Sequence, residues 1–567
     1  MAQRIRIIDG VQARMGQVGT QLVTRVRPSV RLSPRVPDLK PLTLPDPYGD
    51  TTRGADLLEG RWRYGGQSID VGSHGHPFST SLPSERFASW VHSFDWLADL
   101  LSVPGGAAKA GQLAVQWVDA FPSGSPFVFA PDLLAKRSLH WGSQLARLED
   151  SRGAVISRYV GQLKLLRRTL AQVTPGLPAL RAQAAIVIYG ARLNEKSEAT
   201  LSKALDGLAD EIALQILADG GHVSRSPYAT VEALDILQKA DQALQAANLQ
   251  GSRALDRAID RLLPMITTLR HTDGEMALFH GSQAGDAKRI DALMKYRGGE
   301  APQAFAFSPH SGYHRLQAGG TVVLTDAGGV APRPYDLDAH VAPLSVEIST
   351  IEGRLLTNCG WHDAASPAWR RPVRSSAAHS TLTIADRSPG EILEAGFLAE
   401  ALGPAIADEP DNVRSRRKEQ SQGIWLESSH DGYKQDHGLV HRRRLFVGET
   451  GDDIRGEDSL FVPAGDVPLT RDAVPFSLRF HFHPNVRVSL AQDLSSALLV
   501  QKGVAGWRFR TDGGPLAVEP SVYLGDNAKP VRCQQLVISR KALGDGDGLG
   551  KDNRVRWSFR RLKGRDS

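Results

Sequence analysis

Three polar residues of the kinds that bind metals or move protons stand at the ends of apolar runs in the second half of the chain. His340 lies just before the run 344–348, Asn358 follows the run 355–356, and His379 precedes a further apolar stretch. From His340 onward the apolar residues fall on alternate positions, which predicts a strand with one buried face. On that face, His340 is either a core imidazole or part of a site built on a sheet.

A second group of reactive side chains lies in the segment 219–228, DGGHVSRSPY, between two predicted helices. Its two glycines permit a tight backbone, and His222, Arg225 and Tyr228 follow within seven residues. An imidazole, a guanidinium and a phenol could together neutralise a carboxylate and transfer a proton. The alternative is a plain loop in which Pro227 opens the next helix.

Two further segments carry histidines and arginines. Residues 428–433 and 441–444, SSHDGY and HRRR, could line a groove for a polyanion or form exposed strand charges. In 480–484, FHFHP, the histidines alternate with core-type phenylalanines, which favours a structural or surface role. Neither a GxSxG nucleophile motif nor a phosphate-binding P-loop is present, and no pair of glycosidase carboxylates stands out.

Length and charge restrict the class of protein. With 567 residues the chain exceeds the usual size of one hydrophobic core, so at least two domains are expected. Lys and Arg outnumber Asp and Glu by 68 to 62, and the net charge of +6 suits an acidic polysaccharide partner or simply a solvated basic surface. Because no nucleic-acid motif accompanies the charge, nucleic acid is the weakest candidate and is not a predicted partner.

Cysteines and apolar runs bear on location. Cys359 and Cys533 lie in different segments, so no disulfide framework or metal knuckle is visible. No apolar run is long enough for a membrane span. The N-terminus lacks the apolar core of a signal peptide, which predicts a cytoplasmic protein as written, while a misassigned start codon would allow a periplasmic or cell-envelope location.

Three regions follow from the local patterns. Residues 1–80 are rich in Arg, Pro and Gly, and they predict a short helix and then an irregular arm anchored by Trp62 and Tyr64. Residues 81–300 contain successive amphipathic helices, the first over 84–102 with Ser84 as its start. Residues 301–567 contain many short alternating strands without helical crossovers, which predicts an antiparallel sandwich.

The order of these elements and several motifs resemble the heparinase II/III-like polysaccharide lyases. The matching pieces are DGGHVSRSP, DGEMALFHG, SGYHRLQAGGTVVLTDAGG, AHVAPLSVEIS, GRLLTNCG, AAHSTLTI, HDGYKQDHGLVHRRRLFV and FHFHPNVRVSLAQ. The likeness is good over about 305–500 and weaker over the helical half. It implies an α+β multidomain chain: an incomplete (α/α) toroid over 81–300, followed by an antiparallel β-sandwich over 301–567.

The resemblance also implies an activity, β-elimination on a uronate-containing polysaccharide. In such enzymes a carboxylate is neutralised, the C5 proton is removed and the C4–O bond breaks. Carried over by position, the candidate catalytic residues are His222, Tyr228, His340 and Asp338, and the candidate substrate-binding residues are Arg225, Arg442 and Tyr313. No cofactor is required, and a structural zinc would be held by His340, Asn358 and His379.

This chain departs from the pattern of the family at several of these positions. The family's sandwich motif reads His-x-His-x-Asp, but Asp338 stands at the first position and Ala342 at the last. The toroid tyrosine position is Ala229, with Tyr228 one residue early, and Asn358 replaces an aspartate in the zinc set. Two hypotheses follow: a lyase, or a non-catalytic protein of the same fold that binds glycans or assembles envelope polysaccharide.

Overall fold

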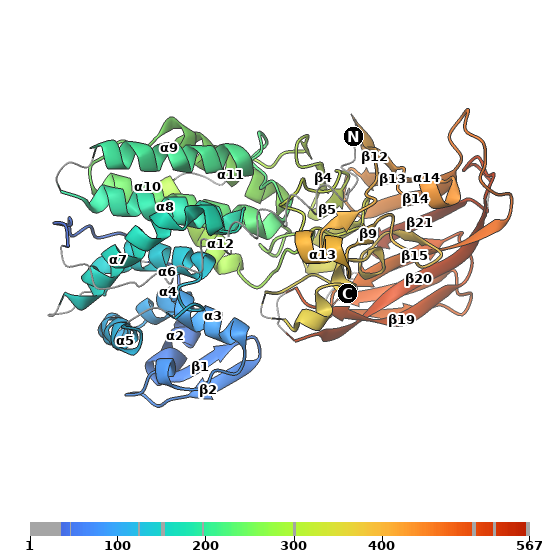
Figure 1. Cartoon of the computed structure of the whole chain (residues 1–567). Coiled ribbons are helices and arrows are strands. Elements are labelled where there is room, and N and C mark those ends of the chain that lie inside the picture. The colour runs from blue at the N-terminus through green and yellow to red at the C-terminus, as the bar shows by residue number, and fades with distance from the viewer. Residues whose placement is uncertain are drawn as a thin grey trace.

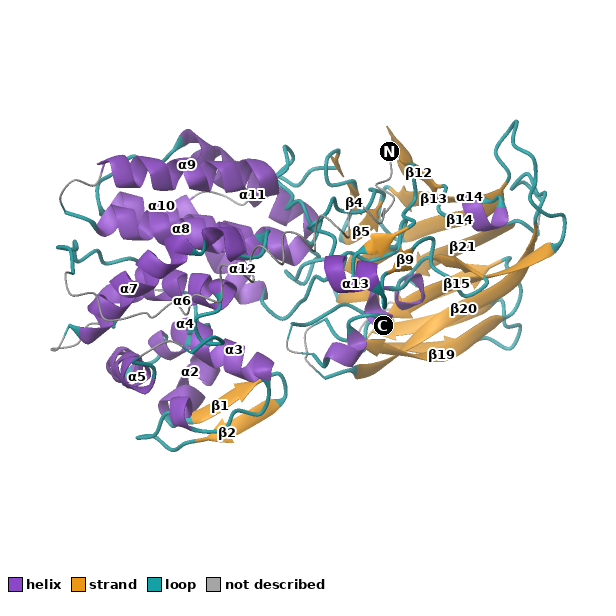
Figure 2. Cartoon of the chain, viewed as in Figure 1, coloured by secondary structure: helices purple, strands orange, loops and turns teal. Residues whose placement is uncertain are grey.

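The structure is a computed structural model that describes residues 36–45, 47–122, 125–148, 153–194, 198–298, 302–363, 365–501, 506–525, 529–550 and 552–562. Figure 1 shows the first half of the chain, coloured blue to green, as packed helices beside the layered strands of the second half. Figure 2 divides the molecule into the same helical and strand regions. The predicted α+β chain, with a helical half before antiparallel sheets, is confirmed. The predicted N-terminal helix lies outside the described residues.

The described part of the predicted arm forms a helix and a hairpin, α2 (Thr51–Leu58), β1 (Arg61–Tyr64) and β2 (Gln67–Asp70). The prediction of an irregular arm is therefore wrong for 51–70, because a Gly-Gly turn with positive φ closes the hairpin. The two predicted anchors are confirmed. Trp62 is buried with its ring centroid 5.0 Å from that of Trp96, and Tyr64 stacks on Trp90 at 5.1 Å.

The incomplete toroid consists of helices that pack against their neighbours in sequence and against the helix after next. They are α3 (Glu85–Ser93), α4 (Leu97–Leu101), α5 (Gly106–Ala120), α6 (Pro131–Gln144), α7 (Ala154–Arg168), α8 (Leu177–Arg192), α9 (Glu198–Gln215), α10 (Pro227–Ala246), α11 (Arg253–Leu269) and α12 (Ala287–Met294). Helix α8 is central, since it contacts α6, α9 and α10. None of the described helices is long and apolar enough to cross a bilayer.

The first toroid helix is shorter than its periodicity predicts. Ser84 caps α3 as expected, accepting a hydrogen bond from the Phe87 backbone at 3.2 Å. The chain then leaves the helix at Phe94, whose φ is +61°, before α4 begins. The break is stabilised by Trp96, whose indole donates to the Val91 carbonyl at 2.9 Å, so aromatic packing overrides the helical pattern.

Two antiparallel sheets form the sandwich. One has nine strands: β3 (Phe307–Ser308), β4 (Tyr313–Ala318), β5 (Thr321–Asp326), β6 (Val346–Thr350), β7 (Gly353–Thr357), β8 (Leu382–Ile384), β15 (Ala473–Phe482), β19 (Leu516–Tyr523) and β20 (Val531–Leu543). The other, in spatial order, has β11 (Val413–Gln420), β12 (Gly423–His430), β13 (Val440–Gly448), β14 (Asp453–Phe461), β21 (Arg554–Arg561), β18 (Gly506–Thr511), β17 (Ser496–Gln501) and β16 (Val486–Leu490).

The sheets bury one face each in a shared apolar core. Leu445, Phe480, Trp557 and Phe559 belong to that core, and the residues between them along each strand point the other way. A pair of short strands, β9 (Glu391–Ile392) and β10 (Ile406–Ala407), and the helices α13 (Phe397–Leu402) and α14 (Lys434–His437) complete the described elements of this half.

The strand predicted to start at His340 begins later. β6 starts at Val346, and the segment before it is irregular, with Leu344 at φ +59° and a single parallel bridge between Val341 and Ser375. The alternation of apolar residues over 340–345 therefore does not reflect strand geometry. These residues are buried because the segment passes between the toroid and the sandwich.

Candidate functional site

A buried charged cluster joins the toroid to the sandwich. Arg225, from the loop between α9 and α10, forms an ion pair with Asp326 at the end of β5, and His280 Nε2 lies 2.7 Å from Asp326 Oδ2. Arg225 Nε also donates to the Ser311 carbonyl at 2.8 Å. Burial alone would raise the pKa of Asp326, but Arg225 and His280 outweigh burial and lower that pKa to about 2. Asp326 and Arg225 are therefore ionised at neutral pH.

Hydrogen bonds from the backbone assign the tautomers of the adjacent histidines. His280 Nδ1 accepts from the His340 amide at 3.0 Å, and His340 Nε2 accepts from the Gly281 amide at 2.8 Å. His340 Nδ1 must then donate to His379 Nε2, 2.7 Å away, and His379 Nδ1 donates to the Ser375 carbonyl at 2.8 Å. Every ring nitrogen in this chain of hydrogen bonds is occupied.

Burial reinforces the neutral state of these rings. Burial, followed by the neighbouring His379, lowers the pKa of His340 well below its usual value. Burial also lowers the pKa of His379 to about 4. A catalytic base needs a free lone pair directed at its substrate, and neither imidazole has one in this arrangement.

His222 is placed inside the toroid. Its Nδ1 lies 2.7 Å from the Ser224 hydroxyl and its Nε2 3.1 Å from Gln215 Oε1. The residue is 2% exposed, and burial lowers its pKa to about 3. The imidazole is therefore neutral and holds the loop that follows α9.

Tyr228 stands in the first turn of α10 and is part of a different polar group. Its hydroxyl donates to Asp286 and accepts from Arg289 Nη1 at 3.0 Å. Burial raises the pKa of the phenol well above its ordinary value. The hydroxyl therefore stays protonated and joins α10 to the start of α12.

The remaining predicted residues have separate environments. Tyr313 is buried, donates its hydroxyl to the Arg225 carbonyl, and lies under the Arg225 guanidinium at 5.1 Å. Asp338 has 56% of its side chain exposed and pairs with Arg370 at 2.8 Å. Arg442 lies on the outer face of β13. The structure thus gathers Arg225, Tyr313 and His340 around His280, whereas Asp338 and Arg442 face outward.

The predicted zinc set has the geometry of a hydrogen-bonded pair. His340 Nδ1 and His379 Nε2 are 2.7 Å apart with a proton between them, and Asn358 Oδ1 accepts from the Ser380 amide at 3.1 Å. Within the described ranges no group of three His, Cys, Asp or Glu residues is arranged to hold a metal. A closed zinc site needs four ligands, so these residues as placed do not fit one.

Two cavities lie next to this region. The smaller, about 10 Å³, is lined by Arg225, His280, Asp326 and His340 and has room for about one water molecule. The larger, about 1300 Å³, lies among the loops of the sandwich and shares Val341 and Pro410 with the smaller one. Its lining holds more carboxylates than basic groups: Asp386, Glu391, Asp408, Glu409, Asp411, Asp431 and Asp436 against Arg371, Arg387 and Lys434. This excess of carboxylates is unfavourable for binding an acidic polysaccharide.

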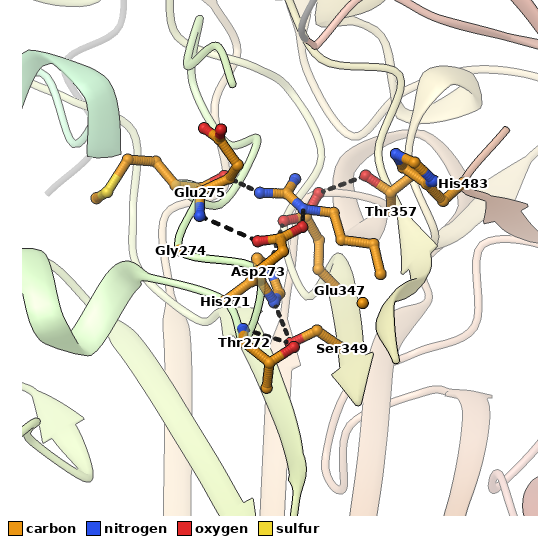
Figure 3. Close-up of polar contacts among 12 residues, drawn as sticks. His271, Thr272, Asp273, Gly274, Glu275, Glu347, Ser349, Thr357 and His483 are labelled. Atoms are coloured by element: carbon orange, nitrogen blue, oxygen red, sulfur yellow. Dashed lines mark hydrogen bonds and ion pairs between the residues drawn. The ribbon is translucent and has the colours of Figure 1, made fainter. Parts of the chain in front are cut away.

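A second set of contacts closes the boundary between the toroid and the sandwich (Figure 3). His271 Nδ1 lies 2.8 Å from the Ser349 hydroxyl and its Nε2 2.9 Å from Glu347 Oε2. Arg354 Nε donates to Asp273 at 3.1 Å. The turn that ends the last long toroid helix is thereby fixed on strands β6 and β7.

The DGG motif has a similar role. Asp219 accepts from the Ser311 amide at 2.7 Å and from the Ser311 hydroxyl at 2.8 Å, so the toroid holds the loop before β4. Gly220 has a φ of +88°, and a Cβ at Gly221 would lie 2.0 Å from that hydroxyl. The two glycines therefore permit this close approach, as the sequence predicted for a tight backbone.

Sequence reasoning did not single out His271, His280, Asp326 or Glu347. The available signal was an aspartate closing the apolar strand TVVLTD and a histidine in FHG, each within a segment that resembles the family. His481 was assigned a structural or surface role, and it is structural, since it is 2% exposed with Nδ1 2.8 Å from the Ser521 hydroxyl.

Comparisons with known proteins agree with this architecture. Residues 300–558 match the family described as heparinase II/III-like, C-terminal. A crystal structure of heparinase III superposes with a TM-score of 0.65 at 12% identity, covering 97% of this chain and 90% of that one. The heparan sulfate lyase HepC of Pedobacter heparinus superposes with a TM-score of 0.57 at 14% identity, covering 98% and 89%. At these identities the likeness shows the fold.

A nearer relative has a different kind of name. FtsZ-localized protein C of Caulobacter vibrioides (strain NA1000 / CB15N) is 34% identical over 522 residues, which cover 91% of this chain and 89% of that protein. The relationship therefore extends over both the toroid and the sandwich. The chain belongs to the heparinase II/III-like family and shares a family with FtsZ-localized protein C.

Proposed function

We propose that this chain is a non-catalytic protein built on a polysaccharide-lyase fold, and that it acts with FtsZ by binding partners. The strongest support is the hydrogen bonding of the two histidines, His222 and His340, that stand at candidate catalytic positions. Both nitrogens of His222, and both of His340, are already hydrogen-bonded inside the protein. The name of the 34% identical relative supports the association with FtsZ.

The association is tested by locating the protein in the bacterium that encodes it. A fluorescent fusion of the full chain should coincide with FtsZ, and purified chain should be retained on immobilised FtsZ but not on the blank support. Diffuse fluorescence together with no retention would refute the association. The fluorescent protein alone is the matched control.

A second candidate is the lyase itself, cleaving a uronate-containing polysaccharide by β-elimination, and the shared fold supports it. Glycan binding without cleavage is the related alternative. Purified protein would be incubated with heparan sulfate, chondroitin, hyaluronan, alginate and bacterial exopolysaccharides, with and without zinc, while absorbance of unsaturated uronate ends is followed. We expect no growth in absorbance. Growth that Tyr228→Phe abolishes in a folded variant would refute the non-catalytic proposal.

A further inference from the structure

The outer face of the eight-stranded sheet is densely cationic. Along each strand the core residues alternate with outward-pointing ones, so the register identifies which side chains share this face. Its cationic members are Arg414, Arg416 and Lys418 on β11, Arg442 and Arg444 on β13, Arg455 on β14, Arg554, Arg556 and Arg560 on β21, Arg508 and Arg510 on β18, and Arg487 on β16.

Acidic side chains neutralise only the middle of this face. On the described strands the outward acidic residues are Glu427, Asp453 and Glu457. Arg444 lies between the two glutamates, with Nε 2.6 Å from Glu427 and Nη1 3.1 Å from Glu457. The row through these residues alternates in sign and is internally satisfied.

The flanking rows are only partly neutralised. One row crosses the strands as Arg414, Ser429, Arg442, Ser459 and Arg554, with serines in place of carboxylates. Arg554 reaches Glu457 of the neighbouring row at 3.8 Å, but among the described residues neither Arg414 nor Arg442 forms an ion pair. Cations with no anion within their own row are expected to gain most from an external one.

A second row places like charges side by side. Arg508 pairs directly with Arg560 across β18 and β21, an arrangement that destabilises a sheet by itself. Arg560 has Asp453 at 3.6 Å, but Arg508 has no ion pair with any described residue. No contact of Arg508 with a described residue therefore offsets this repulsion.

One edge of the Arg442 guanidinium has hydrogen-bond donors without a partner. Its guanidinium stacks on the Phe461 ring at 5.0 Å, and neither Nε nor Nη2 has a hydrogen-bond partner. These two nitrogens form the edge that binds a carboxylate through two parallel hydrogen bonds. The hydroxyl of Ser459, 1% exposed, also lacks a partner. Both groups are covered in this conformation, so a ligand would bind them only if the covering side chains moved.

From these observations we propose that the outer face of the eight-stranded sheet docks an acidic protein surface. The cations are almost all arginine, and Trp425, 44% exposed and packed on Phe446, lies among them. Arginine and tryptophan are the residues enriched at protein interfaces, whereas lysine is depleted there. Arg442 supplies the fork that a glutamate or aspartate of the partner would occupy.

Other polyanions fit this face less well. The row containing Glu427 and Glu457 is already paired internally, so it adds little attraction for a dense array of phosphates or sulfates, such as an anionic membrane, whereas its alternating charges match the mixed charges of a protein surface. Single-stranded nucleic acid needs a series of aromatic platforms, and the described strands expose one tryptophan on this face. The proposed docking requires an acidic partner surface, whether that partner is FtsZ or another protein.

The experiment measures binding of fluorescent poly-L-glutamate to the purified full chain by anisotropy, at an ionic strength of about 0.15 M. In the test variant, Arg414→Gln, Arg442→Gln and Arg554→Gln are combined. The matched control removes three exposed cations elsewhere, Lys203→Gln, Arg532→Gln and Lys541→Gln. We expect the test variant to bind roughly tenfold more weakly, about 1.4 kcal/mol, and the control to bind like wild type.

A second variant guards against misfolding of the first. Arg487→Gln, Arg508→Gln and Arg510→Gln alters exposed side chains only and removes the Arg508–Arg560 repulsion, so its melting temperature should be no lower than that of wild type while its binding weakens. The proposal is overturned if wild type does not bind, if test and control variants lose affinity equally, or if single-stranded oligonucleotide or phosphatidylglycerol vesicles bind more tightly than poly-L-glutamate. Each of these outcomes leaves localisation with FtsZ a separate question.

Discussion

Asp326 shows how a single buried carboxylate can decide what the neighbouring residues do. It accepts from Arg225 of the toroid and from His280, and burial keeps bulk solvent from competing for these bonds. The guanidinium is thereby committed to the fold, although the sequence offers it as a substrate-binding group. Where every charge is paired internally, a side chain acts as a clamp between domains.

Replacing Asp326 with asparagine should therefore destabilise the protein strongly. The change leaves the buried Arg225 without its counter-ion, which costs about 3–5 kcal/mol in comparable sites. Urea denaturation followed by circular dichroism would measure the loss in unfolding free energy. Asp338→Asn is the matched control, because its ion pair with Arg370 is exposed and is worth less than about 1 kcal/mol. Equal effects of the two substitutions would contradict the role of the cluster.

Among the elements, strand β6 and the turn after α11 depend on each other. Glu347 on β6 accepts from His271 Nε2 at 2.9 Å, from the Leu278 amide at 3.0 Å and from the Asn358 amide at 2.9 Å. Burial would raise the pKa of Glu347, but the hydrogen bond from His271 and its other partners lower it instead. One carboxylate thus fixes the toroid turn and the chain following β7.

Glu347→Ala should cause the toroid and the sandwich to unfold in two separate thermal transitions. It leaves several buried donors unsatisfied, each at a cost of about 1–3 kcal/mol, and these donors belong to both sides of the boundary. Scanning calorimetry should show a lower melting temperature and two transitions. Glu419→Ala, which removes an exposed carboxylate of β11 paired only with Arg417 in the same strand, should leave the wild-type trace. A single, unshifted transition in Glu347→Ala would show that the boundary does not depend on this residue.

For the whole molecule, the main apolar core of the toroid extends into the first strands of the sandwich. Tyr313, Val322 and Leu324 belong to the same cluster as the helix residues. The histidines at and near this boundary are buried in the neutral form. Unfolding at low pH is then coupled to protonation of these side chains.

The stability of the whole chain should fall on mild acidification. Burial lowers the folded-state pKa to about 3 for His222, about 4 for His379 and about 3 for His481. An unfolded histidine has a pKa of about 6.5, so below that pH the unfolded chain binds more protons. The stabilisation that each buried, neutral histidine contributes is complete above pH ~6.5. It is lost progressively as the pH falls toward 4, by on the order of 3 kcal/mol per residue.

Urea denaturation at a series of pH values between neutrality and mild acid would measure the free energy of unfolding as a function of pH. This free energy should change less steeply with pH in His379→Gln, which removes one titrating group. Constant stability across the interval would contradict the buried, neutral state of these rings.

The amino-acid sequence by itself determined the classes of element and their order. Helical periodicity in the first half and alternation in the second are local properties, because each records which side of an element meets the core. The cap at Ser84 and the tight turn at Gly220 could also be predicted, since both depend on neighbouring residues. The motif order then identified the family, and the substituted positions at Asp338, Ala342 and Ala229 indicated an altered site.

Only the tertiary structure decided which partners the reactive side chains contact. His340 and His379 lie 39 residues apart and share one proton, while Arg225 finds Asp326 101 residues away. Such pairings depend on how the toroid meets the sandwich, which no local pattern records. Burial is likewise a property of the assembled chain, and burial, with the hydrogen bonds it protects, keeps these histidines neutral and paired inside the protein. The cationic sheet face appears only when register brings arginines from separate strands together.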